Sequence, residues 1–408
     1  AAEAPGTLLL AEAFWMMEGY FVRSLGMHRV YNSAFMNMLK SEENAKYRET
    51  IRNTLEFDRE ILKRFVNFMN NPDEETAFAQ FGGGDKYFGV CTLLATMPGL
   101  PMFGHGQIEG LKEKYGMEYR RALLDEKPEA EIEERHRKEI FPLLGKRPLF
   151  AGAENFTLFD FVTPAGINEN VFAYSNRSGD EGVLVLYNNS LEGAAGTIRT
   201  SVPYRDKARG DSLRQRSLGE ALDIPDNPRS WLIMRQHQNG LEFIRNCREI
   251  ARYGLHADLP GYGAQLYWEM RIVADDAEGR YRNLAEELAG SGCHDIEGEV
   301  RRLHMRPLHQ TLGEVLSPPR IERLREALFR GTPLPEGYFR DLEEGYRRFL
   351  RQGMEEFPPP SLPADREVLI NRTVADSLEQ IVRIASLDLA ADAEESGLNG
   401  SRYYVTDP

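Results

Sequence analysis

Three polar clusters near the start of the chain carry side chains that could do chemistry. Each cluster directly follows an apolar run of the kind that forms a buried strand: Glu12, the group Asn71-Pro72-Asp73, and the group His105-Gly106-Gln107. Two carboxylates at neighbouring strand ends are what cleavage of a glycosidic bond needs. One protonates the leaving oxygen, and others face the positive charge that develops on the sugar. Strand-end carboxylates also serve many other chemistries, so the residue types alone do not decide the reaction.

The elements around these clusters alternate between strand-like and helix-like patterns. Apolar runs at residues 7–15, 27–32, 65–69 and 100–104 are separated by helix-compatible segments at 16–26, 42–65, 86–97 and 130–141. Such alternation indicates parallel βα units, and four units make half of an eight-stranded barrel. In parallel barrels the reactive groups lie at the carboxyl ends of the strands, where the three clusters fall. We also expect Asp85 to be the N-cap of the helix that follows it.

The pattern changes twice beyond the βα units. Short β-rich segments at residues 156–162, 171–175, 182–188 and 196–203 predict a β-sandwich, whereas residues 205–253 are polar and helix-leaning. A further strand is expected within 259–270, and residues beyond 275 have helical spacing. The predicted fold class is therefore α/β. We expect the C-terminal half of a (β/α)8 barrel at 1–148, an all-β sandwich at 149–275 with a possible insertion at 205–253, and a helical region at 276–408.

Composition excludes several classes of function. The chain has 408 residues and a net charge of −14, without a basic run, which argues against binding nucleic acid. Three widely spaced cysteines without a CxxC pair favour a reducing, cytoplasmic compartment. No apolar stretch reaches the roughly 18 residues that span a bilayer. The histidines show no metal-site spacing and no cofactor motif is evident, so we expect neither a metal nor a cofactor.

The order and spelling of the clusters resemble the α-amylase superfamily, glycoside hydrolase family thirteen. Residues 10–15 (Leu-Ala-Glu-Ala-Phe-Trp) resemble the fifth-strand motif, which implies that Glu12 is the general acid/base. Residues 68–73 resemble the seventh-strand motif, which implies that Asp73 binds sugar hydroxyls and stabilises the transition state. Residues 97–107 resemble the signature that leads into the eighth strand, and residues 171–175 and 183–189 resemble the following β-sandwich.

The resemblance suggests further contacts with the sugar. Candidate substrate-binding residues are Trp15, Tyr31, Asn71, His105 and Gln107. A structural role is the alternative for three of them: core packing for Trp15, and satisfaction by the backbone for the loop pair His105 and Gln107. Calcium often accompanies this family, but its usual ligands belong partly to the half of the barrel that is missing here, so none is expected.

Two departures from the family pattern matter for the mechanism. Pro72 stands where the family has a histidine that contacts the sugar. The family nucleophile, an aspartate at the end of the fourth strand, is absent because the sequence opens at the fifth strand. A retaining enzyme needs that carboxylate roughly 5–5.5 Å from its acid. We therefore expect a portion of a longer or split enzyme.

Two hypotheses follow. The first is a part of a retaining glycosidase or glucanotransferase that acts on α-glucans or maltooligosaccharides, with an N-terminal barrel half as partner. Self-association through the open strand edges would be another way to cover them. The second is a non-catalytic carbohydrate-binding or scaffolding protein derived from the same fold, with the helical region as its interaction surface.

Overall fold

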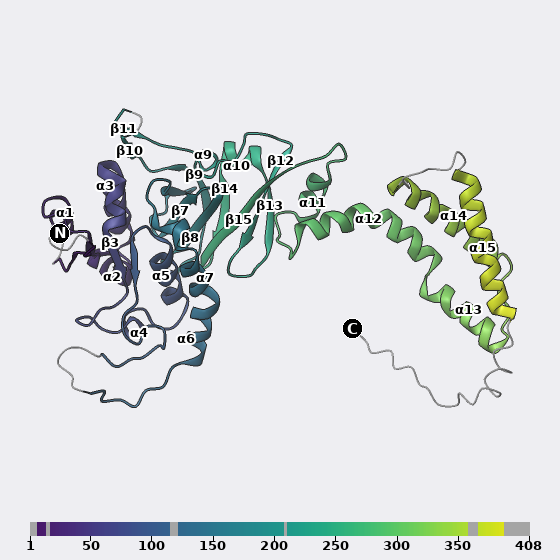
Figure 1. Ribbon diagram of the computed structural model, residues 1–408, viewed down its shortest axis with the longest axis horizontal. Helices are drawn as coiled ribbons and strands as arrows, with labels where there is room; N and C mark the ends of the chain where they lie inside the picture. The colour runs from purple at the N-terminus through teal and green to yellow at the C-terminus, as the bar shows by residue number, and fades with distance from the viewer. Residues whose placement is uncertain (1–5, 14–16, 115–120, 208–209, 358–365, 387–408) are drawn as a thin grey trace. The chain divides into compact units, whose positions relative to one another are not determined.

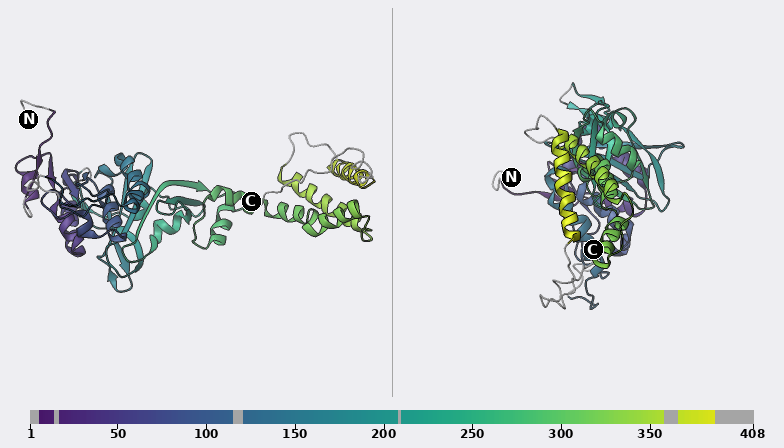
Figure 2. Two further views of the ribbon diagram at one scale, coloured as in Figure 1. Left: turned by 90° about the horizontal axis from the view of Figure 1, so that it is seen from below. Right: turned by 90° about the vertical axis from the view of Figure 1, so that its right-hand side faces the viewer.

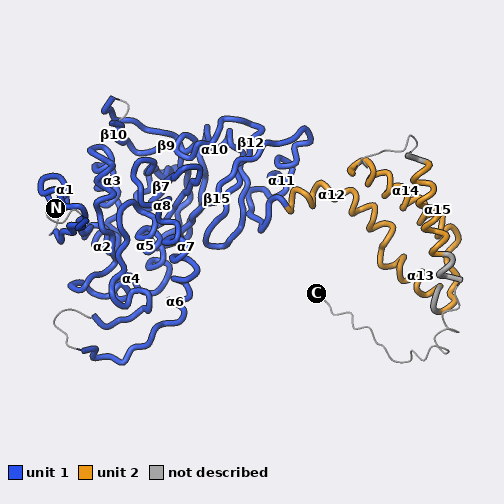
Figure 3. The backbone as a smooth tube through the Cα atoms, in the orientation of Figure 1, with its two compact units in different colours: residues 1–297 blue, residues 298–408 orange. Residues whose placement is uncertain are grey.

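The computed structural model describes residues 6–13, 17–114, 121–207, 210–357 and 366–386 (Figure 1). The chain divides into two compact units, Ala1–Glu297 and Gly298–Pro408, which are coloured separately in Figure 3. The strand-end residues all belong to the first unit, so its internal arrangement decides where they lie. The boundaries expected at residues 148/149 and 275/276 stay predictions.

A four-stranded parallel sheet opens the first unit. Its strands are β1 (Leu10–Ala11), β2 (Arg29–Tyr31), β3 (Phe65–Phe68) and β4 (Leu100–Met102), in the spatial order β1-β2-β3-β4. Every neighbouring pair is parallel, as the alternation of strand and helix patterns predicts. The connections are α1 (Glu18–Arg23), α2 (Ser33–Lys40), α3 (Asn44–Asp58), the 3-10 helix η1 (Arg59–Arg64), α4 (Ala77–Phe81) and α5 (Asp85–Thr96).

Burial within this sheet rises towards its middle. Three of the four residues of β3 are buried, whereas Leu10 in β1 and Leu100 in β4 remain 45% and 43% exposed. Among the described strands, β1 and β4 therefore form open edges with apolar side chains on them. Closure of such a sheet into a barrel stays a prediction.

Helix α5 forms the buried centre of this part of the unit. Ten of its residues are buried, because its sequence from Tyr87 to Thr96 is apolar on nearly every side. The helix stops before Pro98 and Gly99, as expected. The expected N-cap is wrong: Gly84 occupies the N-cap position, and Asp85 is the first helical residue, where its carboxylate pairs with Arg135 at 3.2 Å.

The segment after β4 is helical but not regular. The single helix expected at 130–141 is split into α6 (Ala130–Arg135), a π-helical turn η2 (His136–Ile140) and α7 (Phe141–Gly145), and α8 (Arg147–Ala151) follows. The turn buries His136 completely, with its ring against Tyr87 and Phe88. The extra residue of the π-helical turn places the His136 ring inside an aromatic core. The periodicity of the sequence does not predict this turn.

A large antiparallel sheet follows, and Figure 2 shows its teal strands next to the helices of the parallel sheet. Hydrogen bonds link its strands into one nine-stranded sheet, in the order β13-β12-β15-β8-β7-β5-β9-β14 with β6 on β5. The strands are β5 (Thr157–Thr163), β6 (Gly166–Ile167), β7 (Val171–Ser178), β8 (Glu181–Asn188), β9 (Ala194–Ser201), β12 (Ser230–Gln236), β13 (Glu242–Asn246), β14 (Leu255–Leu259) and β15 (Ala264–Ala274). A separate two-stranded ribbon contains β10 (Tyr204–Asp206) and β11 (Ser212–Arg214).

The all-β character of this region is as expected, but the strands form one continuous sheet. Residues alternate along β7: Phe172 and Tyr174 join the core shared with the parallel-sheet helices, whereas Val171 and Ala173 join a second core on the opposite face. Each face is therefore buried, which explains why the strands read as apolar runs. The register shift between Phe159 and Phe161 in the pairing of β5 with β9 marks a local irregularity in the sheet.

The expectation of a helix-leaning insertion at 205–253 is wrong. Among the described residues of this range the α-helices are the short α9 (Leu218–Leu222) and α10 (Cys247–Tyr253), whereas β12 and β13 are integral strands and β12 pairs with β15. Charged residues interrupt the apolar pattern of these strands. They are tolerated in the sheet because they form ion pairs with residues of neighbouring strands. Glu242 is 3% exposed and pairs with Arg235 and Arg271, each at 2.9 Å.

The remaining residues are helical, as the spacing beyond residue 275 predicts. Helix α11 (Arg280–Leu288) lies in the first unit, and α12 (Ile296–Val315) begins there. The second unit contains α13 (Pro318–Arg330), α14 (Tyr338–Glu356) and α15 (Arg366–Ser386). Val315, Tyr338 and Leu342 form its apolar cluster. None of the helices among the described residues is long and apolar enough to cross a membrane.

Candidate functional site

The polar residues of interest lie at one edge of the parallel sheet. Glu12 directly follows β1, Tyr31 ends β2, and Asp73 lies in the turn after β3. Because all four strands are parallel, their carboxyl ends face the same way, so these groups share one rim. Glu12 and Asp73 are exposed to solvent there, and Tyr31 is half-buried.

Tyr31 ends β2, the strand that lies between β1 and β3, which precede the two carboxylates. Its ring packs against Phe68 of β3, with the ring centroids 5.2 Å apart. Burial raises the pKa of the Tyr31 phenol, and the negative charges of Glu12 and Asp73 raise the pKa further. The Tyr31 hydroxyl is therefore close enough to both carboxylates for each negative charge to raise its pKa. The structure thus brings together Glu12, Tyr31 and Asp73, three of the residues predicted from the sequence.

The turn that carries Asp73 is held by Asn71. The Oδ1 atom of Asn71 accepts hydrogen bonds from the backbone N–H groups of Asp73 and Glu74, each at 3.0 Å. Lys114 adds a hydrogen bond from its Nζ to the carbonyl oxygen of Asp73 at 2.7 Å. This Asx turn fixes the backbone beneath the Asp73 carboxylate. Asn71 is therefore a positioning residue in this structure, and its contact with a sugar stays a prediction.

Gln107 does not face the rim, contrary to the prediction that it contacts a sugar. Its side chain is 1% exposed, and its Nε2 lies 3.3 Å from Sδ of Met69 and 3.6 Å from Sγ of Cys91. Its Oε1 accepts a hydrogen bond from the backbone N–H of Gly104 at 3.2 Å. Both ends of the side-chain amide have partners inside the protein, so Gln107 holds the loop after β4 against the core. His105, two residues earlier, is exposed at the surface.

A buried relay supports that loop, and sequence reasoning missed it. The hydroxyl of Tyr87 donates to the carbonyl oxygen of Gln107 at 2.5 Å and lies 2.9 Å from Nε2 of His136. Burial lowers the pKa of His136 from its usual 6.5 to about 4, so the ring is neutral at pH 7. No local motif marks this relay, because its members come from three separate segments.

A second buried pair fixes the ends of β2 and β3. Asn32 donates from Nδ2 to Oδ1 of Asn67 at 2.8 Å, and Oδ1 of Asn32 caps α2 at the backbone N–H of Phe35. Asn67 in turn donates to the carbonyl oxygen of Pro98 at 3.4 Å. The network connects the residue after β2 to β3 and to the segment before β4, so it helps to fix β2 against β3. A polar residue directly after a short apolar run was the available signal for Asn32.

Two further expectations bear on the site. Trp15, predicted to stack on a sugar ring, lies outside the described residues. Among the described residues, no group of three or more histidine, cysteine, aspartate or glutamate side chains could hold a metal ion. The rim presents two exposed carboxylates and a half-buried phenol.

No family model and no curated protein sequence matches the chain. Comparison of structures returns α-amylases. An α-amylase from Geobacillus thermoleovorans, complexed with acarbose, is 15% identical with a TM-score of 0.45, and the match covers 64% of this chain and 53% of that one. A debranching enzyme from Nostoc punctiforme is 16% identical with a TM-score of 0.44, covering 65% of this chain and 52% of that one.

A cyclomaltodextrin glucanotransferase with a three-domain ABC distribution is similar too. It is 16% identical with a TM-score of 0.42, and the match covers 66% of this chain and 52% of that one. The chain spans about half the length of the proteins it matches.

Proposed function

We propose that this chain is the C-terminal part of an α-amylase-like glycosidase or glucanotransferase that acts on α-glucosidic bonds with retention of configuration. The observation that carries the proposal is the shared rim, where Glu12 and Asp73 both act on the Tyr31 phenol. Glu12 protonates the leaving glycosidic oxygen and then activates water or an acceptor sugar. Asp73 holds ring hydroxyls more tightly in the distorted transition state than in the ground state.

The other rim residues take supporting roles in this proposal. Tyr31 keeps its proton, because burial and two carboxylates raise its pKa, and a neutral phenol can donate a hydrogen bond to a sugar oxygen. His105 contacts sugar from the end of β4, and Trp15 provides an apolar face for a pyranose ring. Asn71 and Gln107 hold the loops on which these groups stand.

The nucleophile comes from an N-terminal barrel half that pairs with this chain. Support for this comes from the open edge of β1, where Leu8, Leu9 and Leu10 are 57%, 38% and 45% exposed. Apolar side chains along an unpaired strand favour pairing with another strand. We place the assembled enzyme in the cytoplasm, since the structure forms no disulfide among Cys91, Cys247 and Cys293.

The test compares turnover of maltoheptaose by a polypeptide that contains both barrel halves with turnover by its Glu12→Gln variant. Loss of the general acid is expected to lower kcat by about a hundredfold or more. A near-normal rate for Glu12→Gln would refute the assignment. The 408-residue chain by itself is expected to be inactive. Activity of this chain that depends on Glu12 would place the nucleophile within it and contradict the strand alignment.

The alternative is a non-catalytic carbohydrate-binding or scaffolding protein derived from the same fold. Under that alternative the same rim binds α-glucan without cleaving it. Acarbose, the compound present in the Geobacillus structure, separates the two readings when used with the two-half polypeptide. Binding of acarbose without any turnover of maltoheptaose would support the binding protein, whereas turnover would exclude it.

A further inference from the structure

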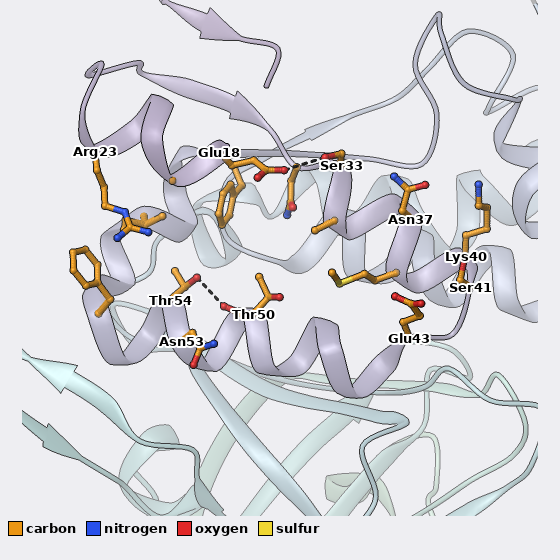
Figure 4. Close-up of a pocket in the computed structure, with 17 residues that line it drawn as sticks. Glu18, Arg23, Ser33, Asn37, Lys40, Ser41, Glu43, Thr50, Asn53 and Thr54 are labelled. Atoms are coloured by element: carbon orange, nitrogen blue, oxygen red, sulfur yellow. Dashed lines mark hydrogen bonds between the residues drawn. The ribbon is translucent and has the colours of Figure 1, made fainter. Parts of the chain in front are cut away.

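A cavity of about 490 Å³ lies between α1, α2 and α3 in the first unit, and its lining is shown in Figure 4. The lining contains charges of both signs, from Glu18, Arg23, Lys40 and Glu43. Because the signs are mixed, the lining does not select one class of ligand. A groove in the second unit has a simpler lining, and its chemistry points to one kind of partner.

This groove lies among the helices of the second unit, which is drawn in orange in Figure 3, and has a volume of about 260 Å³. The volume is below the roughly 300–1,000 Å³ of small-molecule sites, so the groove suits a few side chains of a protein better than a whole small ligand. Residues from the end of α12 and from α13, α14 and α15 line it. The apolar part of the lining includes Leu316, Ile321, Leu324, Leu342, Leu378 and Ile381.

Part of this apolar lining is open to solvent. Leu316 and Ile321 are 53% and 51% exposed. Leu324, Leu378 and Ile381 are only partly buried against the apolar cluster of the unit. Apolar side chains that gather in one exposed groove gain free energy when another apolar surface covers them. The groove therefore has room for apolar side chains that the described helices of the second unit do not supply.

Arg320 is the one charged residue that the described lining contains, and its guanidinium lacks an acceptor. Within the described part of the chain it forms no ion pair, and its Nη1 atom is buried without a hydrogen bond. A buried donor without an acceptor is costly, above all when it is charged. The neighbouring carboxylates of Glu314 and Glu322 already pair, with Arg348 at 2.9 Å and with Arg325 at 2.5 Å. The groove therefore lacks a carboxylate.

The positive charge also acts on a tyrosine of the groove. Burial raises the pKa of the Tyr338 phenol, and the positive charges of Arg320 and Arg323 oppose this rise. Tyr338 lines the groove, and its hydroxyl donates to the carbonyl oxygen of Arg320 at 2.9 Å, which holds the start of α14 against α13. One side of the apolar groove is therefore positively charged.

We propose that this groove binds an amphipathic helix of another protein, and that a carboxylate of that helix pairs with Arg320. Apolar residues at positions i, i+3, i+4 and i+7 of such a helix form one stripe, which fills the groove. An aspartate or glutamate beside the stripe supplies the acceptor that Arg320 lacks, in a charge-assisted hydrogen bond. The second unit thereby anchors the chain to its partner, independently of the function proposed for the first unit.

A membrane surface fits the groove less well than a helix does. Anionic lipids attract clusters of basic residues, whereas α13 and α14 also expose acidic residues, such as Glu322 and Glu344. These carboxylates would be repelled by an anionic membrane. A helix needs only one carboxylate, placed at Arg320.

Binding of a synthetic peptide to the full 408-residue chain, measured by fluorescence anisotropy, tests the inference. The peptide has about 15 residues, with leucines at i, i+3, i+4 and i+7 and glutamates beside them. Arg320→Gln should weaken its binding about tenfold or more, the effect of losing one charge-assisted hydrogen bond. A second peptide, with glutamine in place of each glutamate, should bind the unmodified chain and the Arg320→Gln chain with equal affinity.

Two further variants separate the charge from the apolar contact. Arg330→Gln is the matched control, because Arg330 lies on the same helix but outside the groove lining, and its side chain is 66% exposed. It should leave the affinity for both peptides unchanged. Ile321→Ala should weaken the binding of both peptides at least about fivefold, since it removes an apolar contact at the groove. Ile321 is half exposed, so the fold should survive its truncation, which circular dichroism checks.

Several results would overturn the inference. Equal effects of Arg320→Gln on the two peptides would do so, as would no binding of the glutamate peptide at millimolar concentration. Self-association of the full chain that Ile321→Ala abolishes, followed by sedimentation velocity, would assign the groove to a second copy of the chain. Binding to phosphatidylcholine vesicles that Ile321→Ala abolishes would assign it to a membrane instead.

Discussion

Replacing Arg48 should destabilise the first unit more than any surface substitution on the same helix. The Arg48 side chain, on α3, is completely buried and forms ion pairs with Asp160 and Glu169. It also donates to the carbonyl oxygens of Phe159 and Val171, at 3.2 and 3.1 Å. One guanidinium therefore connects the helices of the parallel sheet to β5 and to the β5–β7 region of the antiparallel sheet.

The expected cost follows from the exposure of its partners. Removing one partner of a buried ion pair costs about 3–5 kcal/mol when the other charge stays buried. The carboxylates of Asp160 and Glu169 are 23% and 34% exposed, so they recover hydration when the arginine is lost. The two carbonyl oxygens and the space left by the side chain remain. We therefore expect Arg48→Ala to lower the free energy of unfolding by about 3 kcal/mol, the lower end of that range.

Urea unfolding followed by tryptophan fluorescence measures this change. The three tryptophans, Trp15, Trp231 and Trp268, all precede residue 298, so the signal reports the first unit. Arg52→Ala is the control, since Arg52 pairs with Glu169 at 3.6 Å and is 34% exposed, which predicts a loss below about 1 kcal/mol. Equal midpoints for the two variants would refute the view that Arg48 holds the two sheets together.

Two further perturbations test the core. Gly89→Ala in α5 would place a Cβ atom 1.9 Å from the ring of Tyr187, so we expect a loss of at least about 1–3 kcal/mol in urea unfolding. Gly145→Ala has open space around the new Cβ and should change stability by less than about 0.5 kcal/mol; similar losses at the two positions would contradict the packing argument. His136 has its pKa lowered to about 4 by burial, so below pH 6.5 only the unfolded state takes up the proton. Stability from this group is complete above pH 6.5 and falls by up to about 3 kcal/mol as the pH approaches 4, which His136→Gln should abolish in unfolding curves measured between pH 7 and pH 4.5. Parallel pH dependence in the two proteins would show that another group is responsible.

Sequence patterns predicted the parallel units because short apolar runs alternate there with helix-compatible segments. They failed at β12 and β13, where Arg235 and Glu242 interrupt the strand pattern. Glu242 looks like a surface residue in the sequence, yet it is buried between two arginines and accepts a hydrogen bond from the backbone N–H of Ile296 at 2.9 Å. The charge of Glu242 is balanced by Arg235 of β12 and Arg271 of β15. A pattern within one segment cannot predict these pairs, because their members are far apart in the sequence.

The candidate site shows the same division. Glu12 and Asp73 were predicted because each polar residue follows an apolar run and resembles a family motif, and the structure places both, exposed, after the carboxyl ends of β1 and β3. Gln107 satisfies the same two criteria, but its side chain turns into the core and is buried among Met69 and Cys91. Motif position predicts which loop a residue occupies, whereas the direction of the side chain depends on the polar groups that the interior leaves unsatisfied. The cavity beside Glu18 was missed because its lining comes from several elements, none of which forms a motif.

The spacing of the strands argues that the nucleophile lies on the far side of β1. Glu12 follows β1 and Asp73 lies in the turn after β3, with β2 between these strands; neighbouring strands are about 4.8 Å apart, so β1 and β3 are roughly 10 Å apart. The acid and nucleophile of a retaining enzyme lie roughly 5–5.5 Å apart, a distance closer to the spacing of adjacent strands. Among the described strands, the only neighbour of β1 is β2, whose end carries Tyr31 rather than a carboxylate. The proposed nucleophile therefore belongs on the unpaired edge of β1, and the product of the two-half enzyme should keep its anomeric configuration when followed by proton NMR. An inverted product would instead mean that Glu12 and Asp73 act from opposite faces of the sugar, one protonating the leaving oxygen and the other activating the attacking water.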